Sequence, residues 1–541
     1  MSHITDMTWI YKTWIANLAL LAATAVASLL VSTAHAAAPG ITGPNFDLTA
    51  APGYISQPDG SSIYSWGYGC NTAPSGFAPA TITNASCPAG VMQLPGPTLI
   101  VNQGQTVTVT LHNNLPVAAG KTSILFPGFN VTASGGTAGL LAQEAANLGT
   151  VTYTFVADTP GTHTYYSGTQ GDLQVEMGLY GALIVLPTNG NAVPAGYATP
   201  ANLPDTCHLH ATGSTATLPN GDPDFRLAAS AYNHSAACYD REYLFQFSEI
   251  DPVIHRAAEE IASCVTGPGV NCPANMNTVA TEPYVPAYFM VNGRSMPDLM
   301  DPNYAAQYPH QPYNGNPHMH PGELVLLRVI GTGRWQHPFH EHGNHVRVLA
   351  RDGHMLLTPS SNKLAGPLLF TTTTTPGMAL DGIFQWTGKG LNWDVYAHTA
   401  GHTEPCVPDA NGYYTTGSGA LPTAPNYFEW CADHEKALES KPFGQVGSGG
   451  PVTLPDPNIL ANGPWYSGSP YLGPEATARA VGSTPIPPSG TVSNSPTDEA
   501  GFAYMWHSHN EREITTNNAF PGGMMMMMLV DPWVFPIIEA N

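Results

Sequence analysis

Two short segments of the sequence concentrate histidine at a spacing that suits metal binding. The segments WQHPFHEHGNHVRV and WHSHNERE each contain a His-x-His pair. Side chains two residues apart on a strand point to the same face of a sheet. The pairs His340/His342 and His507/His509 would therefore each project two imidazoles together. Imidazole is a ligand for copper, zinc, iron and nickel, so four imidazoles meeting across one sheet predict a site for a single metal ion.

Further side chains of the same segments are candidates for a supporting role. A carboxylate can join the ligands of a metal ion or orient an imidazole from behind. The alternative interpretation is that all these histidines are ordinary hydrogen-bonded residues at strand ends. The residues that could be additional ligands or partners of the ligands are His337, His345, Glu341, Glu511 and Glu513. No spaced Ser/His/Asp set, G-x-S-x-G motif or phosphate loop is found in the sequence, so catalytic residues are not identified.

The elements that must position these histidines are predicted to be strands. The chain has 541 residues, of which 43% are hydrophobic and only 10% charged, with 55 glycines and 51 prolines. This balance favours many short strands joined by turns over helices. Alternation of Val, Thr and Leu with polar residues in residues 94–116 predicts the first clear strands of an antiparallel sandwich. We therefore predict an all-β protein.

The order of segments predicts two sandwich domains and an export signal. A long apolar run ends at Ala34-His35-Ala36, which fits a signal-peptide cleavage site. The alternative is that this run remains as a membrane anchor. The predicted parts are a signal peptide at 1–36, an extension at 37–65, a first domain at 66–190, a linker at 191–240, and a second domain at 241–541 with an insertion at about 400–498.

Cysteine usage agrees with export, and the net charge bears on the expected partners. In an oxidising compartment an even number of cysteines predicts disulfides. Sequential pairing is the preferred arrangement among the many connectivities that are open, and no C-x-x-C motif points to a metal. The cysteines are Cys70, Cys87, Cys207, Cys238, Cys264, Cys272, Cys406 and Cys431. The formal net charge of −22 argues against a nucleic-acid partner.

Several motifs of the sequence resemble those of the multicopper oxidase superfamily. PGPTLIVNQGQTVTVTLHNNLP and GLYGALIV resemble the opening and the close of its cupredoxin domain. HPFHEHGNH resembles the third copper motif, H-P-x-H-x-H-G, and WHSHNERE resembles the fourth, H-C-H-x-x-x-H. The resemblance implies two cupredoxin-like Greek-key β-sandwich domains. It also implies that the four paired histidines match ligands of a trinuclear copper cluster, and that His337 matches the first histidine of a blue copper site.

The sequence departs from these motifs at the positions that matter most for electron transfer. The blue-copper cysteine is replaced by Ser508, whose hydroxyl cannot substitute for a soft thiolate. The second blue-copper histidine falls at Glu513. In the first domain TSILFPG stands where the family has H-W-H-G, and YYSG stands where it has Y-H-S-H. The lost ligand positions are Ser508, Leu125, Pro127, Tyr166 and Gly168.

These observations predict a secreted multicopper-oxidase-like protein that binds one metal ion, with copper preferred and zinc or another divalent metal as alternatives. We expect neither a blue copper site nor ordinary laccase turnover. One alternative is an active oxidoreductase with a reduced copper complement, oxidising a small substrate or a metal ion. Another is a structural cupredoxin-fold protein of the cell surface or matrix. The expected partner is a metal ion, with no nucleic acid and no stable membrane insertion after signal cleavage. A homo-oligomer stays open, and the expected location is periplasmic, cell-surface or extracellular.

Overall fold

The structure is a computed structural model whose described residues are almost entirely strands, turns and loops. It describes residues 38–188 except 81 and 83, 226–389 except 229 and 235, and 501–537 except 534. Between 389 and 501 it describes 407–415, 427, 428, 430, 432, 468–471, 477, 478, 492 and 493. The expected signal peptide, most of the linker and most of the insertion lie outside these residues.

The first sandwich consists of a six-stranded and a five-stranded sheet, with a small hairpin beside them. The six-stranded sheet has the order β5 (Met92–Gln93), β3 (Ser62–Cys70), β2 (Asn45–Ser56), β7 (Thr106–Asn113), β11 (Thr150–Val156) and β8 (Thr132–Gly135). The five-stranded sheet has the order β12 (Gly161–Tyr166), β13 (Tyr180–Leu186), β6 (Leu99–Asn102), β1 (Gly40–Thr42) and β4 (Phe77–Ala78). The hairpin pairs β10 (Gln143–Glu144) with β9 (Thr137–Ala138).

Strand β7 shows why the alternating sequence folds this way. Val107, Val109 and Leu111 are buried, whereas the threonines between them are partly or fully exposed. A strand with one apolar face must cover that face against a second layer. Strands β1 and β2, within the expected extension at 37–65, pair with β6 and β7 respectively, so this segment is part of both sheets.

The second sandwich again consists of two large sheets. The seven-stranded sheet has the order β15 (Tyr288–Val291), β14 (Arg241–Ile250), β17 (Leu324–Gly331), β23 (Ala379–Gln385), β19 (Val346–Arg351) and β20 (His354–Met355), with β21 (Leu368–Leu369) on β19. The six-stranded sheet has the order β16 (His318–Met319), β28 (Met525–Val530), β27 (Gly501–Ser508), β18 (His337–Glu341) and β22 (Thr371–Thr374), with β24 (Gly468–Tyr471) on β27. Strands β25 (Thr477–Ala478) and β26 (Val492–Ser493) form a separate pair.

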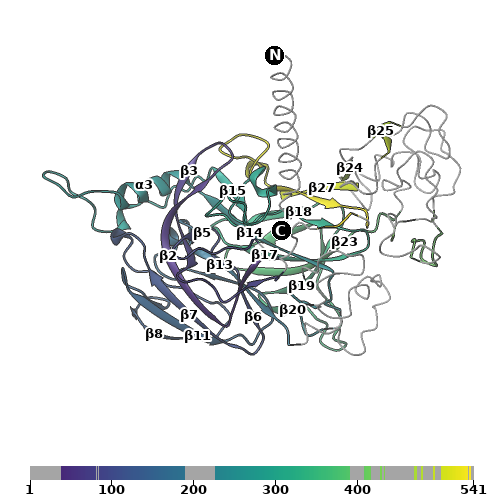
Figure 1. The fold of residues 1–541 in the computed structure, drawn as a ribbon, viewed down its shortest axis with the longest axis horizontal. Coiled ribbons are helices and arrows are strands. Elements are labelled where there is room, and N and C mark those ends of the chain that lie inside the picture. Colours follow the sequence, from purple (N-terminus) through teal and green to yellow (C-terminus); the bar gives the residue numbers. More distant parts are fainter. Residues whose placement is uncertain are drawn as a thin grey trace, which may run out of the picture. The chain divides into compact units, whose positions relative to one another are not determined.

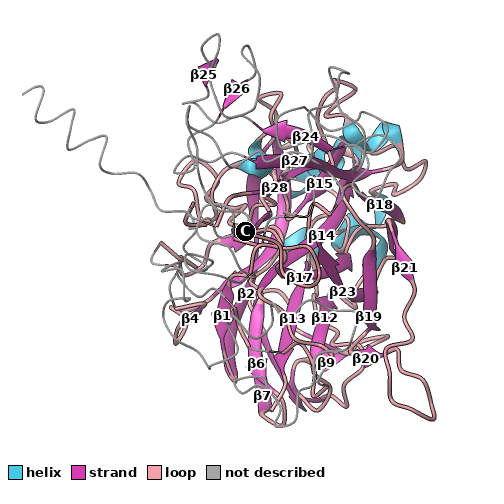
Figure 2. Cartoon of the chain, turned by 90° about the vertical axis from the view of Figure 1, so that its right-hand side faces the viewer, coloured by secondary structure: helices cyan, strands magenta, loops and turns pink. Residues whose placement is uncertain are grey.

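The core of the second sandwich lies between these sheets. Every residue of β17 is buried, because this strand is central in its sheet and both of its faces are covered. Figures 1 and 2 show β14, β17 and β23 running together through this part of the molecule. Three methionines of the C-terminal run, Met524, Met526 and Met528, pack in the same core. The predicted all-β fold of two cupredoxin-like sandwich domains is confirmed.

Helices are few and short. Among the described residues, the α-helices are α2 (Gly171–Gln174) and α3 (Pro252–Ala262), and the 3-10 helices are η1 (Val117–Ala119), η3 (Met276–Thr278), η4 (Asp298–Met300) and η5 (Glu511–Ile514). Helix α3 begins after Asp251, whose side chain accepts a hydrogen bond from the Val253 amide at 2.9 Å. Within the described residues, no helix has both the length and the apolar character needed to cross a bilayer.

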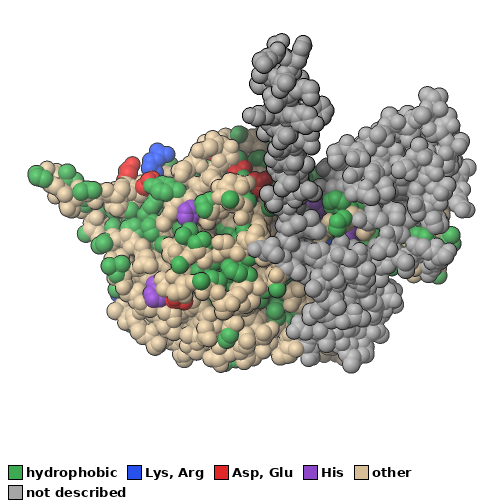
Figure 3. All heavy atoms as spheres, viewed as in Figure 1, with side chains coloured by type: hydrophobic (Ala, Val, Ile, Leu, Met, Phe, Trp, Pro, Cys, Tyr) green, Lys and Arg blue, Asp and Glu red, His purple; other side chains and the backbone are tan. Residues whose placement is uncertain are grey.

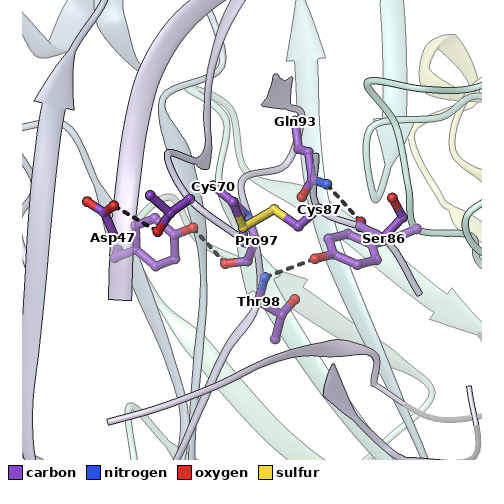
Figure 4. The surroundings of a disulfide bond; sticks show 10 residues. Asp47, Cys70, Ser86, Cys87, Gln93, Pro97 and Thr98 are labelled. Atoms are coloured by element: carbon purple, nitrogen blue, oxygen red, sulfur yellow. Dashed lines mark hydrogen bonds between the residues drawn. A yellow bond between two sulfur atoms is a disulfide. The ribbon is translucent and has the colours of Figure 1, made fainter. Parts of the chain in front are cut away.

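Two of the four predicted disulfides lie within the described residues. Cys70 is bonded to Cys87, and Cys264 is bonded to Cys272. Figure 4 shows the first bond, beside which the Gln93 side chain donates a hydrogen bond to the Ser86 carbonyl at 3.3 Å. Cys238 is also disulfide-bonded. The remaining cysteines, Cys207, Cys406 and Cys431, lie outside the described residues.

The surface reflects the low content of charged residues. On the face shown in Figure 3, charged side chains are few and are scattered among apolar and neutral polar atoms. This agrees with the 10% of charged residues in the whole chain.

Candidate metal centre

Three of the predicted histidines meet where β18 and β27 pair. These strands are antiparallel neighbours, and His340 is directly opposite His507 in the register (Figure 1). His342 follows β18 by one residue, and its Nε2 atom lies 3.2 Å from Nε2 of His507. One nitrogen from each of the three side chains lies within 4.8 Å of the others, and all three residues are buried. The structure thus brings together two segments that are more than a hundred residues apart in sequence.

The fourth predicted histidine lies at the edge of this group. The ring of His509 is 4.5 Å from the ring of His340 and 5.4 Å from that of His507. Its side chain is 51% exposed, and Nδ1 lies 3.3 Å from the exposed carboxylate of Glu511. His509 therefore lies beside the three buried imidazoles with about half of its side chain exposed to solvent.

The environment favours the neutral form of two of the buried imidazoles. Burial and, next, the neighbouring histidines together lower the pKa of His340 to about 4. Burial also lowers the pKa of His507. The Nδ1 atom of His507 donates to the carbonyl of Ser508 at 2.8 Å, which leaves the lone pair on Nε2. A neutral imidazole with a free lone pair is the form that binds a metal ion.

The positions that match a blue copper site are also brought together, but they form a hydrogen-bonded network. His337 is buried on the opposite face of β18, with Nδ1 2.8 Å from Glu513 and Nε2 2.9 Å from Glu249. Ser508 donates a hydrogen bond to the same Glu513 carboxylate. Burial alone would lower the pKa of His337, but its hydrogen bonds to the two carboxylates and their charges raise it to about 9. Both ring nitrogens are thus occupied by protons at neutral pH.

Glu249 was missed by the sequence reasoning. It lies in β14, in a strand whose ten residues are all buried. A carboxylate in an otherwise buried strand must find a partner, and this was the signal in EYLFQFSEI that could have revealed it. The identity of the partner, His337, depends on how β14 and β18 pack in the sandwich.

The other predicted supporting residues do not point to the three buried histidines. Glu341 faces away from them, accepts a hydrogen bond from Thr372 at 2.7 Å, and has its pKa raised to about 8 by burial. His345 packs its ring 5.0 Å from Phe370. Glu511 is exposed beside His509.

The first-domain positions contribute no nitrogen donor. Leu125 and Tyr166 are joined by main-chain hydrogen bonds, and a side chain at Gly168 would collide with Leu125. Pro127 is half-buried and has no polar side-chain atom. A trinuclear copper cluster needs imidazoles from both domains, so these residues do not fit it. The three buried imidazoles of the second domain fit one copper or zinc ion.

Comparison with known protein families identifies the first domain. Residues 79–190 match the multicopper oxidase family. The chain carries a multicopper oxidase domain. The match falls on the first domain of the chain. In this domain the four positions where the family has copper-binding histidines hold Leu125, Pro127, Tyr166 and Gly168.

Individual relatives are similar over the same limited extent. The chain is 42% identical to an L-ascorbate oxidase of Cucurbita maxima over 117 residues, which is 20% of this chain and 19% of that protein. It is 41% identical to an L-ascorbate oxidase of Cucumis sativus over 117 residues, again 20% of this chain and 19% of that protein. The match therefore spans about a fifth of the length of these relatives.

Solved structures of multicopper oxidases have lower sequence identity to this chain. A multicopper oxidase named mgLAC is 15% identical with a TM-score of 0.41, over 90% of this chain and 86% of that one. A blue copper oxidase from Nitrosomonas europaea is 15% identical with a TM-score of 0.41, over 90% of this chain and 85% of that one.

Proposed function

We propose that this protein is an exported member of the multicopper oxidase superfamily that binds one metal ion in its second domain. The ligands are His340, His342 and His507, with His509 completing the set by turning inward. Copper is the preferred ion, with zinc or another divalent metal as the alternative. The observation that carries this proposal is the set of three buried imidazoles, each with one nitrogen within 4.8 Å of those of the others.

The same geometry argues against ordinary laccase turnover. A laccase needs a thiolate that passes electrons from a blue copper ion to a trinuclear cluster. Here Ser508 replaces the thiolate and is hydrogen-bonded to Glu513, while His337 is held between two carboxylates. Export is supported by the signal-like sequence at 1–36 and by the two disulfides.

Metal analysis of the purified chain tests the proposal. We expect close to one copper per chain and an electron-spin spectrum of nitrogen-ligated copper(II) without a blue thiolate band. The double variant His340→Ala/His507→Ala should lose the metal. The matched control is His354→Ala, because His354 is exposed, hydrogen-bonds to the Asp352 carbonyl and lies on β20 of the other sheet. Retention of the metal by the double variant would exclude this site.

A second candidate function is oxidation of a small substrate or a metal ion by a protein that holds fewer copper ions than other multicopper oxidases. It is favoured by the pairing of both second-domain motifs in one site. Oxygen uptake by the copper-loaded chain with phenols or divalent manganese distinguishes the two. Turnover that disappears in the double variant supports the oxidase. Metal binding without turnover supports a binding protein, and failure to bind metal supports a structural role.

A further inference from the structure

A cavity of about 340 Å³ lies between the two sandwiches, apart from the histidine cluster. Its apolar wall consists of Leu125, Leu141, Val175 and Pro376. Residues of both domains line it, since Gly331–Arg334 at the end of β17 face the first-domain residues. Cavities of this size at domain boundaries are the usual sites of small ligands.

The cavity occupies the place of lost copper ligands. Leu125, Tyr166 and Gly168 stand at positions where the family carries histidine, and all three line the cavity. The replacements removed the nitrogen donors and left apolar surface and one phenol. The cavity therefore favours a ligand that is mainly apolar and not a metal ion.

The Tyr166 hydroxyl is a polar group of the wall that is open to a ligand. The Tyr166 side chain is half-buried, and its hydroxyl makes no hydrogen bond within the described part of the chain. The hydroxyls of Thr164, Ser167 and Thr332 instead donate to main-chain or amide oxygens of the protein. Tyr166 can therefore donate its proton to an acceptor on the ligand.

Charge in the cavity is already neutralised. Arg334 is the charged residue of the lining. Its guanidinium lies 4.0 Å from the centre of the Tyr284 ring and donates to the Glu282 carboxylate at 3.0 Å. It also donates to the Thr281 carbonyl at 3.0 Å. The guanidinium is thus held by protein groups, so the cavity selects a neutral ligand over an anion.

We infer that this cavity binds a neutral, planar aromatic molecule of one or two rings that accepts a hydrogen bond from Tyr166. Gly377 of the lining leaves main-chain surface beside the Tyr166 side chain, because a methyl group added at Gly377 would lie 3.6–4.0 Å from it. Stacking on a tyrosine and burial against aliphatic side chains both favour a planar ring. This site is independent of the proposed metal site.

Fluorescence titration of the full chain with prodan, a neutral two-ring naphthyl ketone, tests the inference. We expect saturable binding to one site per chain, with a shift of the emission to shorter wavelength. Gly171→Phe should block it, weakening binding at least tenfold, because Gly171 lines the cavity and an added Cβ meets no atom within 4 Å. The matched control is Gly267→Phe, since Gly267 is equally unobstructed but lies outside the cavity. This control should bind prodan like the unmodified chain.

Two further variants make the test independent of folding defects. Leu141→Asp changes an exposed residue of the apolar wall and should also weaken binding severalfold. Tyr166→Phe removes only the donor and should weaken prodan roughly fivefold, as expected for one hydrogen bond. Absence of saturable binding in the unmodified chain overturns the inference. So does unchanged binding in both Gly171→Phe and Leu141→Asp. Unchanged binding in Tyr166→Phe overturns the role of the hydroxyl.

Discussion

At the scale of single residues, the replacement of the family's cysteine by Ser508 goes together with a change in the residue that contacts it, Glu513. The serine hydroxyl, Glu513 and His337 form one buried network with Glu249, in place of three copper ligands. A thiolate beside two imidazoles suits copper, whereas a carboxylate on either side of an imidazole suits a proton. The network is therefore complete without a metal, and the change of cysteine to serine is matched by its neighbours.

This network predicts that restoring the cysteine alone will not restore a blue copper site. In Ser508→Cys, both nitrogens of His337 remain bonded to Glu249 and Glu513, so the sulfur finds no imidazole partner for copper. We expect the copper-loaded variant to lack the intense visible absorption of a copper–thiolate bond. Visible spectroscopy of the variant beside the unmodified chain measures this. A strong blue band in the single variant would contradict the assignment of His337.

At the scale of elements, the antiparallel pairing of β18 with β27 creates the candidate metal centre. The register places His340 opposite His507, while Phe339 and Trp506 on the other face enter the core. Because side chains alternate along a strand, a shift by one residue would turn the histidines into the hydrophobic core and the aromatic residues away from it. Phe339 and Trp506, which directly precede His340 and His507, therefore hold the register of the site.

The disulfides act at the same scale, and their contributions should differ. The Cys70–Cys87 bond ties the end of β3 to the loop before β5, with both residues buried and 17 residues apart. The Cys264–Cys272 bond closes a shorter separation of 8 residues in the partly exposed loop after α3. Loop closure contributes about 3 kcal/mol for the longer loop and about 2.5 kcal/mol for the shorter. Loss of buried sulfur adds to the first cost only.

We therefore expect Cys70→Ala/Cys87→Ala to lower the free energy of unfolding more than Cys264→Ala/Cys272→Ala. Urea unfolding of both double variants under the same conditions measures the difference. An equal or reversed order would show that the loop after α3 matters more to stability than its exposure indicates.

At the scale of the whole molecule, buried charge joins the two sandwiches. Asp381 on β23 accepts hydrogen bonds from the main chain and the hydroxyl of Thr162 on β12, at 3.1 and 2.6 Å. Arg328 on β17 donates to the same threonine hydroxyl at 3.0 Å and to Glu242 at 2.8 Å. These contacts anchor the first sandwich on the second and thereby define the cavity between them.

The buried protonated groups predict that the free energy of unfolding decreases as pH rises above neutral. His337 has a pKa of about 9 against an ordinary value of 6.5, so its contribution is complete below pH 6.5 and is lost as pH rises through 9. This loss is on the order of 3 kcal/mol. Burial also raises the pKa of Glu176 and Glu341 from 4.5 to about 8. Each stays protonated in the folded state while it ionises in the unfolded state, so its effect lowers stability as pH rises towards 8 and levels off above that pH. The free energy of unfolding should therefore fall between neutral pH and pH 9.

Histidine-selective NMR labelling isolates the contribution of His337. We expect one imidazole to titrate near pH 9 and its signal to be missing in His337→Gln. If every imidazole has lost its proton by pH 8, His337 is not held between two charged carboxylates.

Local sequence patterns were enough to predict the strands, the two sandwiches and the same-face histidine pairs, because strand periodicity and apolar alternation are local properties. The sequence by itself determined that His340/His342 and His507/His509 each point one way, and that Ser508 cannot supply a thiolate. Only the tertiary structure decided that β18 pairs with β27, that Glu249 reaches His337, and that the lost first-domain positions line a cavity. Those outcomes depend on strands far apart in the chain, and their pairing is set by packing of the whole core.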